Sequence, residues 1–308
     1  MSLGNYTKKA IAEVERELAT AEYSCTYLPK NIKSHLAAEY RLELDSSPEL
    51  TPKRQNYYQG LIEVLHWICE LGRIDILMPV SLMSRYLAQA IEGHLNQVFH
   101  LFAYLKNCER CMLVFDDTMP EIDQSRFHKC DWSEFYLDAK EELPPDMPEA
   151  RRNCVKVTCF VDADHAGCKE TRRSHTGVMI FGNRAPILWF SKRQATVATS
   201  TFGSEIVALR IAIELVEGLR YKLRMLGVPI DGPCNVFCNN EGVVKNTTRQ
   251  ESPIKKKHNS VAYHKARESI AAGIIRVAKE DGATNIADIL TKLLRGEALR
   301  ATAKCGRI

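Results

Sequence analysis

Between residues 153 and 294, the spacing of hydrophobic residues switches repeatedly between the period of a strand and that of a helix. Alternation with a period of two is typical of half-buried strands, whereas repeats every three to four residues are typical of amphipathic helices. Strands are predicted at 155–162, 176–183, 185–192, 235–240 and 274–280, and helices at 206–226, 241–247, 258–273 and 285–294. This order predicts an α/β domain in which helices cover a mixed five-stranded sheet.

The residues before this domain follow a mostly helical period. One amphipathic helix is expected within residues 7–21, and residues 53–111 have the spacing of three packed helices. Residues 112–122 have the composition of a strand, and the acidic, proline-containing segment that follows is expected to be exposed. The predicted organisation is an N-terminal helix and linker (1–52), a helical region (53–111), an acidic connector (112–152), the α/β domain (153–294) and a tail (295–308).

Composition narrows the possible environments and partners. Eleven cysteines without framework spacing favour reduced thiols in a cytoplasmic protein, and no apolar run approaches the ~18 residues of a membrane helix. Residues 154–294 carry 21 Lys and Arg against 13 Asp and Glu, whereas residues 116–150 carry 3 against 11. A basic domain beside an acidic segment fits a module that binds a polyanion, although solvated surface charge alone produces the same numbers.

Three acidic residues lie at or near the ends of predicted strands and helices in this domain. Asp162 ends the first strand, Glu205 lies in the first turn of the long helix, and Asp288 lies near the start of the last helix. Carboxylates that converge in this way hold two Mg²⁺ ions about 4 Å apart in enzymes that hydrolyse phosphodiesters. Taken singly, each carboxylate has a simpler interpretation as a helix cap or a solvated edge residue. Their spacing does not decide between these interpretations.

Ordered motifs add a resemblance to a known family. The strings FVDADHAG, RRSHTGVMIF, APILWFSKRQATVATSTFGSEIVAL, VFCNNEGVVKN and NIADILTKLL resemble, in this order, the ribonuclease H domain of Copia-type retrotransposon polyproteins. The upstream strings YYQGLIEVLHWICELGRIDILMPVSLMSRYLA and HLNQVFHLFAYLK resemble the thumb and connection region of the same polyproteins. Together the motifs cover most of residues 50–294. The resemblance implies a ribonuclease H fold that cuts the RNA strand of an RNA/DNA hybrid with two Mg²⁺ or Mn²⁺ ions and four acidic residues.

The resemblance assigns the first, second and fourth acidic ligands to Asp162, Glu205 and Asp288. The third position falls in Cys238-Asn239-Asn240, where family members usually have aspartate at the position of Asn239. An amide brings a carbonyl oxygen but no charge to cations that prefer anionic oxygen. We therefore expect a degenerate active site with impaired hydrolysis. The alternative is a catalytically dead nucleic-acid-binding or scaffold module.

Basic and hydroxyl-bearing residues supply the expected binding surface. The hybrid would be recognised through phosphates, its minor groove and its 2′-hydroxyls, without base readout. The candidate residues are Arg172, Arg173, Ser174, Thr176, Lys192, Arg193, Lys255, Lys256 and Lys257. For the three lysines alone, a solvated run is an almost equal alternative. The resemblance also implies the remaining Pol polyprotein, with its palm and integrase, as a partner, and a cytoplasmic location or a virus-like particle.

Overall fold

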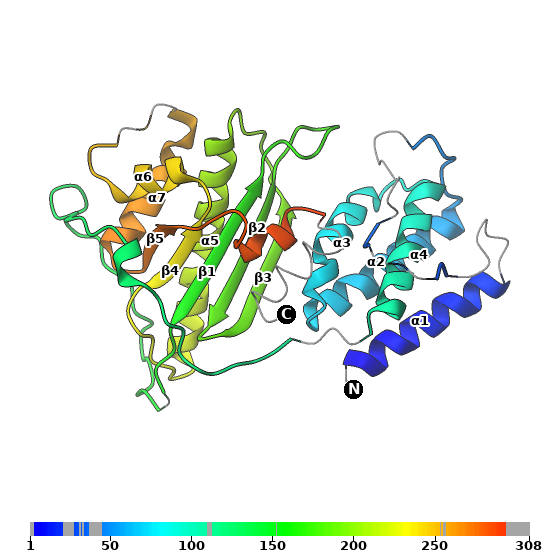
Figure 1. Cartoon of the computed structure of the whole chain (residues 1–308), viewed down its shortest axis with the longest axis horizontal. Coiled ribbons are helices and arrows are strands. Elements are labelled where there is room, and N and C mark those ends of the chain that lie inside the picture. Colours follow the sequence, from blue (N-terminus) through cyan, green and yellow to red (C-terminus); the bar gives the residue numbers. More distant parts are fainter. Residues whose placement is uncertain are drawn as a thin grey trace. The chain divides into compact units, whose positions relative to one another are not determined.

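The computed structural model describes residues 3–20, 28–30, 32, 34–36, 45–109, 113–151, 153–252, 254 and 257–293. The chain divides into two compact units, one formed by Met1–Leu113 with Lys292–Ile308 and the other by Val114–Thr291 (Figure 1). The predicted tail, 295–308, lies outside the described residues. Among the helices that the structure describes, none is long and apolar enough to cross a membrane.

The first unit is helical. Its main helices are α1 (Leu3–Thr20), α2 (Pro52–Glu70), α3 (Leu77–Met83) and α4 (Glu92–Asn107), and the short 3-10 turns η2 (Ile74–Ile76) and η3 (Ser84–Tyr86) flank α3. The predicted helical periods are visible in the core, where Leu65, Ile68 and Phe102 are fully buried. Tyr58 adds a buried hydroxyl that donates to the Met83 carbonyl at 2.7 Å. This bond ties α2 to the end of α3.

The second unit is built on the predicted mixed sheet of five strands. The strands are β1 (Val157–Asp164), β2 (His175–Gly182), β3 (Ala185–Arg193), β4 (Cys234–Cys238) and β5 (Ile275–Lys279), arranged in the order β3-β2-β1-β4-β5. β1 pairs in parallel with β4, and β4 in parallel with β5, whereas β2 is antiparallel to β1 and β3. The C-terminal ends of β1, β4 and β5 therefore meet at one edge, together with the start of β2 and the end of β3.

Helices cover one face of this sheet. α5 (Thr201–Met225) packs against β1, and α6 (Glu241–Thr248) and α7 (Ser260–Ala271) complete the layer. Successive side chains of β1 point to opposite faces of the sheet. Cys159 and Val161 are therefore buried in the core under α5, whereas Phe160 packs on the opposite face. The order of strands and helices confirms the predicted fold class.

The last predicted helix, 285–294, is wrong in type. The structure has a short 3-10 turn, η6 (Ile286–Leu290), which packs against β1 and β2 (Figure 1). Asn285 caps this turn by accepting the Ala287 N–H at 3.2 Å, and its amide donates to the Val161 carbonyl at 3.0 Å. Tertiary bonds to β1 therefore hold the backbone in a tight turn instead of an α-helix.

The strand suggested by the composition of residues 112–122 is absent from the part that the structure describes, residues 113–122. The Asp116 carboxylate accepts both the N–H (3.0 Å) and the hydroxyl (2.6 Å) of Thr118, which bends the chain. Pro120 has no N–H to contribute to a strand ladder. Local side-chain chemistry outweighs the β-forming composition here.

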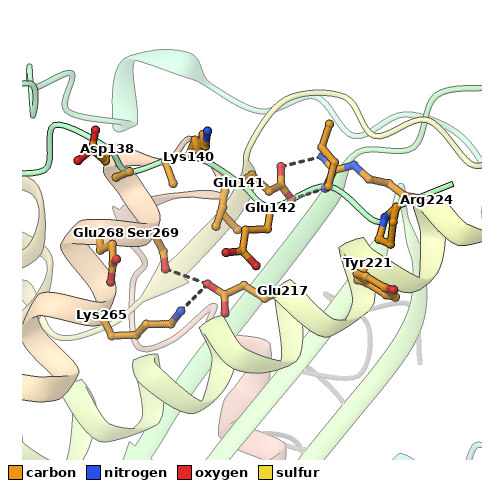
Figure 2. A pocket seen from close by; sticks show the side chains of 15 residues that line it. Asp138, Lys140, Glu141, Glu142, Glu217, Tyr221, Arg224, Lys265, Glu268 and Ser269 are labelled. Carbon is orange, nitrogen blue, oxygen red and sulfur yellow. Dashed lines mark hydrogen bonds and ion pairs between the residues drawn. The ribbon is translucent and has the colours of Figure 1, made fainter. Parts of the chain in front are cut away.

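The acidic segment is packed onto the sheet-containing unit, which begins at Val114 and not at the expected domain start, residue 153. Phe127 lies against Phe237 on the sheet face opposite α5, with ring centroids 5.7 Å apart. Farther along, both carboxylate oxygens of Glu141 accept bonds from Arg220 and Arg224 on α5. Figure 2 shows Glu141 beside Arg224 among the side chains that line a cavity. The volume of this cavity is about 600 Å³. The segment is thus part of this unit.

Candidate functional site

The proposed ligands come from four different elements that end at one edge of the sheet. Asp162 is near the end of β1, and Asn239 directly follows β4. The parallel pairing of Val161 with Cys238 brings these two ends side by side. The Asn239 amide Nδ2 donates to Asp162 Oδ1 at 2.8 Å. Two residues 77 positions apart in the chain are therefore in direct contact.

Glu205 reaches the same edge from α5. Ser200 caps this helix, because its hydroxyl accepts the Gly203 N–H at 3.2 Å. Burial is the largest cause of the raised pKa of the Cys238 thiol, and the charges of Glu205 and Asp162 raise it further. A single thiol at the end of β4 thus lies within electrostatic reach of both carboxylates.

Asp288 is carried to this edge by η6. Gly177, which pairs with Asp162 across β1 and β2, permits the approach. A Cβ at Gly177 would lie 2.8 Å from Leu290 Cβ and from Thr291 Cγ2, and 2.9 Å from the Ala287 carbonyl oxygen. Only glycine leaves room for the turn that bears Asp288.

Replacing Gly177 with alanine should therefore destabilise the second unit by about 1–3 kcal/mol, because backbone and Cβ atoms must move apart. Urea unfolding measures this change. Gly218→Ala is the matched control, since nothing lies within 4 Å of a Cβ at that position in α5 and alanine favours a helix. A Gly177→Ala chain as stable as the unmodified one would show that η6 is not packed in this way.

The Asp162 carboxylate is almost completely satisfied by protein donors. It is 1% exposed, and while Asn239 occupies Oδ1, the Thr291 hydroxyl donates to Oδ2. Two carboxylates at positions 162 and 239 would repel each other and require a cation between them, whereas an amide N–H cancels that repulsion by itself. The Asn239 side chain therefore turns its nitrogen, and not its carbonyl oxygen, toward Asp162.

This donor set does not fit a pair of Mg²⁺ ions as arranged. Divalent cations of this kind need oxygen ligands, and here an N–H group occupies one side of the central carboxylate. Among the residues that the structure describes, no three or more His, Cys, Asp and Glu side chains are grouped so that they would hold a metal ion. The expected third ligand is thus replaced by a group with the opposite hydrogen-bonding role.

Several of the predicted basic residues lie at the same edge of the sheet. His175 pairs with Arg193 and Thr176 with Lys192, so the start of β2 and the end of β3 lie beside the end of β1. Arg172 and Lys192 are exposed, and Arg173 and Arg193 are half-buried. Two exposed positive side chains, Arg172 and Lys192, therefore lie near this edge of the sheet.

Lys257 is exposed in η5 (Lys257–Asn259), next to the first turn of α5. The buried Asn259 amide lies 3.5 Å from the position of a Cβ at Gly203, and within the described residues its Nδ2 has no hydrogen-bond partner. Backbone N–H groups at a helix N-terminus attract anions. Lys255 and Lys256 lie outside the described residues.

Ser174 and Thr176 require a correction, because both are completely buried. Gln194 donates to the Thr176 hydroxyl at 3.0 Å and to the Ser204 carbonyl at 2.9 Å, and the Ser174 hydroxyl accepts the Ala166 N–H at 3.1 Å. These hydroxyls join β2, β3 and α5 behind the carboxylates and do not face a duplex. Serine and threonine next to arginine suggested phosphate contacts, but the sequence carries no signal for their burial.

Sequence reasoning missed Gln194 and Thr291. Gln194 connects the end of β3 to the residue before Glu205, and Thr291 binds Asp162. Hydrophobic periodicity does not predict either bond. Thr291 and Asp162, for example, are 129 positions apart in the chain. Thr291 does lie inside the NIADILTKLL motif, which was the available signal.

The cavity shown in Figure 2 is separate from this edge. It is lined by Glu217, Tyr221 and Arg224 on the C-terminal half of α5, and by residues of the acidic segment and α7. Glu217 is 12 residues beyond Glu205, which corresponds to about 18 Å along a helix. The cavity therefore belongs to the contact between α5 and the acidic segment.

Comparisons with known proteins agree with the resemblance in the sequence. No family model matches the chain. The "Retrovirus-related Pol polyprotein from transposon RE1" of Arabidopsis thaliana is 23% identical over 271 residues, which make up 88% of this chain and 16% of the polyprotein. The corresponding polyprotein from transposon TNT 1-94 of Nicotiana tabacum is 23% identical over 269 residues, or 86% of this chain and 18% of the polyprotein. The chain thus spans about a sixth of these relatives.

Two further similarities each cover about half of the chain. The "Secreted RxLR effector protein 161" of Plasmopara viticola is 36% identical over 167 residues, which are 54% of this chain and 94% of that protein. Among solved structures, LC11-RNase H1 in complex with RNA/DNA hybrid is 19% identical and aligns with 47% of this chain and 99% of its own, with a TM-score of 0.36.

Proposed function

Since this chain belongs to the family of Copia-type retrotransposon Pol polyproteins, we propose that its ribonuclease H domain binds RNA/DNA hybrid but hydrolyses the RNA strand only weakly. The observation that carries the proposal is the direct contact of Asp162 with Asn239 at the ends of β1 and β4. The contact supports a common site for the proposed ligands, and it also gives the reason for weak hydrolysis. A lost anionic ligand and an N–H directed at Asp162 both disfavour divalent cations.

Phosphate binding rests on different residues from cation binding. Arg172, Lys192 and Lys257 are exposed at the edge of the sheet or beside the N-terminus of α5. Positive side chains and helix N-termini bind phosphates without reading base sequence. Hybrid binding is therefore expected to persist where cleavage is lost. The remaining Pol polyprotein, including the palm and the integrase, is the expected partner of the domain.

Fluorescence anisotropy with duplexes of one length tests the binding function. We expect the chain to bind an RNA/DNA hybrid more tightly than double-stranded DNA of the same sequence, because the 2′-hydroxyls and the wide minor groove are present only in the hybrid. Equal affinity for the two duplexes, or no binding to either, would contradict the proposal.

The salt dependence of hybrid binding tests the basic residues. Lys192→Gln and Lys257→Gln should each weaken binding and reduce the slope of log K against log salt by about 0.9 if each lysine neutralises one phosphate. Lys222→Gln is the matched control, since Lys222 is an exposed lysine near the opposite end of α5. Slopes that stay equal among all three variants and the unmodified chain would remove both lysines from the interface.

A catalytically dead scaffold is the second candidate. The observation that favours it is the hydrogen-bonded state of Asp162, in which Asn239 and Thr291 already occupy both oxygens. Such a site is stable as a structural element without any cation. Reversion of Asn239 to aspartate discriminates between the two functions.

A further inference from the structure

We propose that the second unit contains a further binding site, which takes a small planar aromatic carboxylate. The site is a second cavity, with a volume of about 740 Å³. It lies between residues 124–139 of the acidic segment and residues of α7 and β5. Cavities of about 300–1,000 Å³ are the usual size of small-molecule sites.

The second cavity lies at the edge of the sheet opposite to Asp162. Its lining includes Pro233, directly before β4, and Ile275, the first residue of β5. Asp162 and Asn239 lie at the other ends of the parallel strands β1 and β4. The five residues of β4 separate the two edges by roughly 13 Å, at about 3.3 Å per step. A ligand in the second cavity is therefore expected to leave the edge at Asp162 free.

Aromatic side chains of the acidic segment form one wall of the second cavity. Phe127 and Trp132 line it, and they are only 8% and 6% exposed. The Arg267 guanidinium of α7 lies over the Trp132 ring, 5.0 Å from its centroid. Arg267 is itself fixed by hydrogen bonds to four backbone carbonyls. The wall is thus formed before a ligand arrives, and a flat aromatic ring packs well against it.

Arg276 brings a positive charge to the same lining. Its guanidinium lies over the Phe127 ring, 4.1 Å from the centroid, and donates to the side-chain oxygens of Asn235 (2.6 Å) and Gln124 (2.5 Å). Both acceptors are neutral amides, and within the described residues Arg276 forms no ion pair. Burial lowers the pKa of Arg276 below its ordinary value, so the charge has lost part of its hydration. A bound carboxylate would supply the missing counter-charge and accept two N–H bonds in one plane.

Other polar groups of the lining also fit an anion. Lys129 is exposed and adds a second positive charge. Asp131, the acidic residue among the described lining residues, directs its carboxylate to the Ser133 N–H at 3.0 Å. The buried Trp132 indole N–H has no hydrogen-bond partner within the described residues. Buried indole N–H groups usually have such a partner, and a ligand oxygen would provide it.

The charge of the acidic segment favours a small ligand over a strand of nucleic acid. Residues 116–150 carry 3 Lys and Arg against 11 Asp and Glu. A polyanion that followed this segment would be repelled along its length. A single carboxylate beside Arg276 avoids most of that repulsion.

Titration calorimetry of the full chain with two matched compounds tests the proposal. The probes are 2-naphthoate and 2-naphthamide, which share the ring and the shape but differ in charge. We expect 2-naphthoate to bind at least about tenfold more tightly, because only the carboxylate pairs with Arg276. The NMR signal of the Trp132 indole N–H should shift with 2-naphthoate. That of Trp189 should not, since Trp189 is in β3 at the opposite edge of the sheet.

Two arginine variants identify the charge that is responsible. Arg276→Gln should weaken 2-naphthoate at least about tenfold and change the affinity for 2-naphthamide less than about threefold. Arg126→Gln is the matched control, because Arg126 lies over Phe237 and pairs with Glu280 outside the cavity lining. It should change neither affinity. Circular dichroism verifies that both variants are folded.

A third variant tests the cavity without touching a charge. Ala271→Trp adds a large ring to a lining residue at the end of α7, and it should weaken both compounds. Unchanged binding in this variant would overturn the proposal even if the Arg276→Gln chain failed to fold.

Three other results would also overturn the proposal. These are equal affinities for the two compounds, 2-naphthoate binding that is unaffected in a folded Arg276→Gln chain, and no binding of 2-naphthoate at about 1 mM. Displacement of 2-naphthoate by single-stranded oligothymidylate would instead assign the cavity to nucleic acid. Displacement by RNA/DNA hybrid would contradict a site separate from the edge at Asp162.

Discussion

The Asn239→Asp chain is expected to cleave the RNA strand of a hybrid at least about 100-fold faster than the unmodified chain in Mg²⁺ or Mn²⁺. The substitution restores the missing anionic ligand and removes the N–H that now occupies Asp162 Oδ1. It also places two carboxylates in contact, which should lower stability without a divalent cation and restore it when the cation is added. Labelled hybrid and gel analysis measure cleavage, and thermal unfolding with and without Mn²⁺ measures the coupling.

A double variant provides the control. Glu205→Gln in the Asn239→Asp chain should abolish the recovered cleavage, because Glu205 is the proposed ligand from α5, while hybrid binding should persist. Rapid cleavage by the unmodified chain would contradict the degenerate site. An Asn239→Asp chain that binds hybrid but stays inert, with no Mn²⁺-dependent stabilisation, would favour the scaffold function.

Neutralising Glu141 is expected to destabilise the second unit by about 2 kcal/mol at neutral pH. Arg220 is buried on α5, and its guanidinium donates to both carboxylate oxygens of Glu141, at 2.7 and 2.8 Å. The Glu141→Gln chain would leave this charge without its partner in the acidic segment. Urea unfolding at pH 7 measures the loss, and Glu214→Gln, in a more exposed pair with Arg210, should change stability by less than about 0.5 kcal/mol.

The contact of Glu141 with Arg220 and Arg224 also predicts how the stability lost in the Glu141→Gln chain varies with pH. Burial alone would raise the pKa of Glu141, but the hydrogen bonds and charges of Arg220 and Arg224 outweigh it and lower the pKa from 4.5 to about 2. The charged carboxylate therefore contributes its full stability above about pH 4.5 and loses it as the pH falls toward 2. The difference between the unmodified and Glu141→Gln chains should shrink over that range. A difference that is negligible at pH 7, or constant down to pH 2, would mean that the pair does not hold the acidic segment.

Much of the fold could be predicted because its elements follow local hydrophobic periods. The alternation before Asp162 predicts a strand that has one face in the core, and the long repeat after Glu205 predicts a helix that covers it. A pattern of this kind depends on neighbours in the chain, and water enforces it directly by excluding apolar surface. Asp162 and Asn239 could be paired in advance only through the ordered family motifs, and their contact is consistent with that pairing.

The hydrophobic pattern does not predict contacts between residues that are far apart in the sequence. The sequence alone determined the strands, the long helices and the substitution of an amide at position 239. Three features arose only when the chain packed in three dimensions: the hydroxyl of Thr291 on Asp162, the burial of Ser174 and Thr176, and the ion pairs of Glu141. The physical reason is that polar contacts are directional and depend on which surfaces the packed elements bring within about 3 Å, whereas hydrophobic burial leaves a periodic trace in the chain itself.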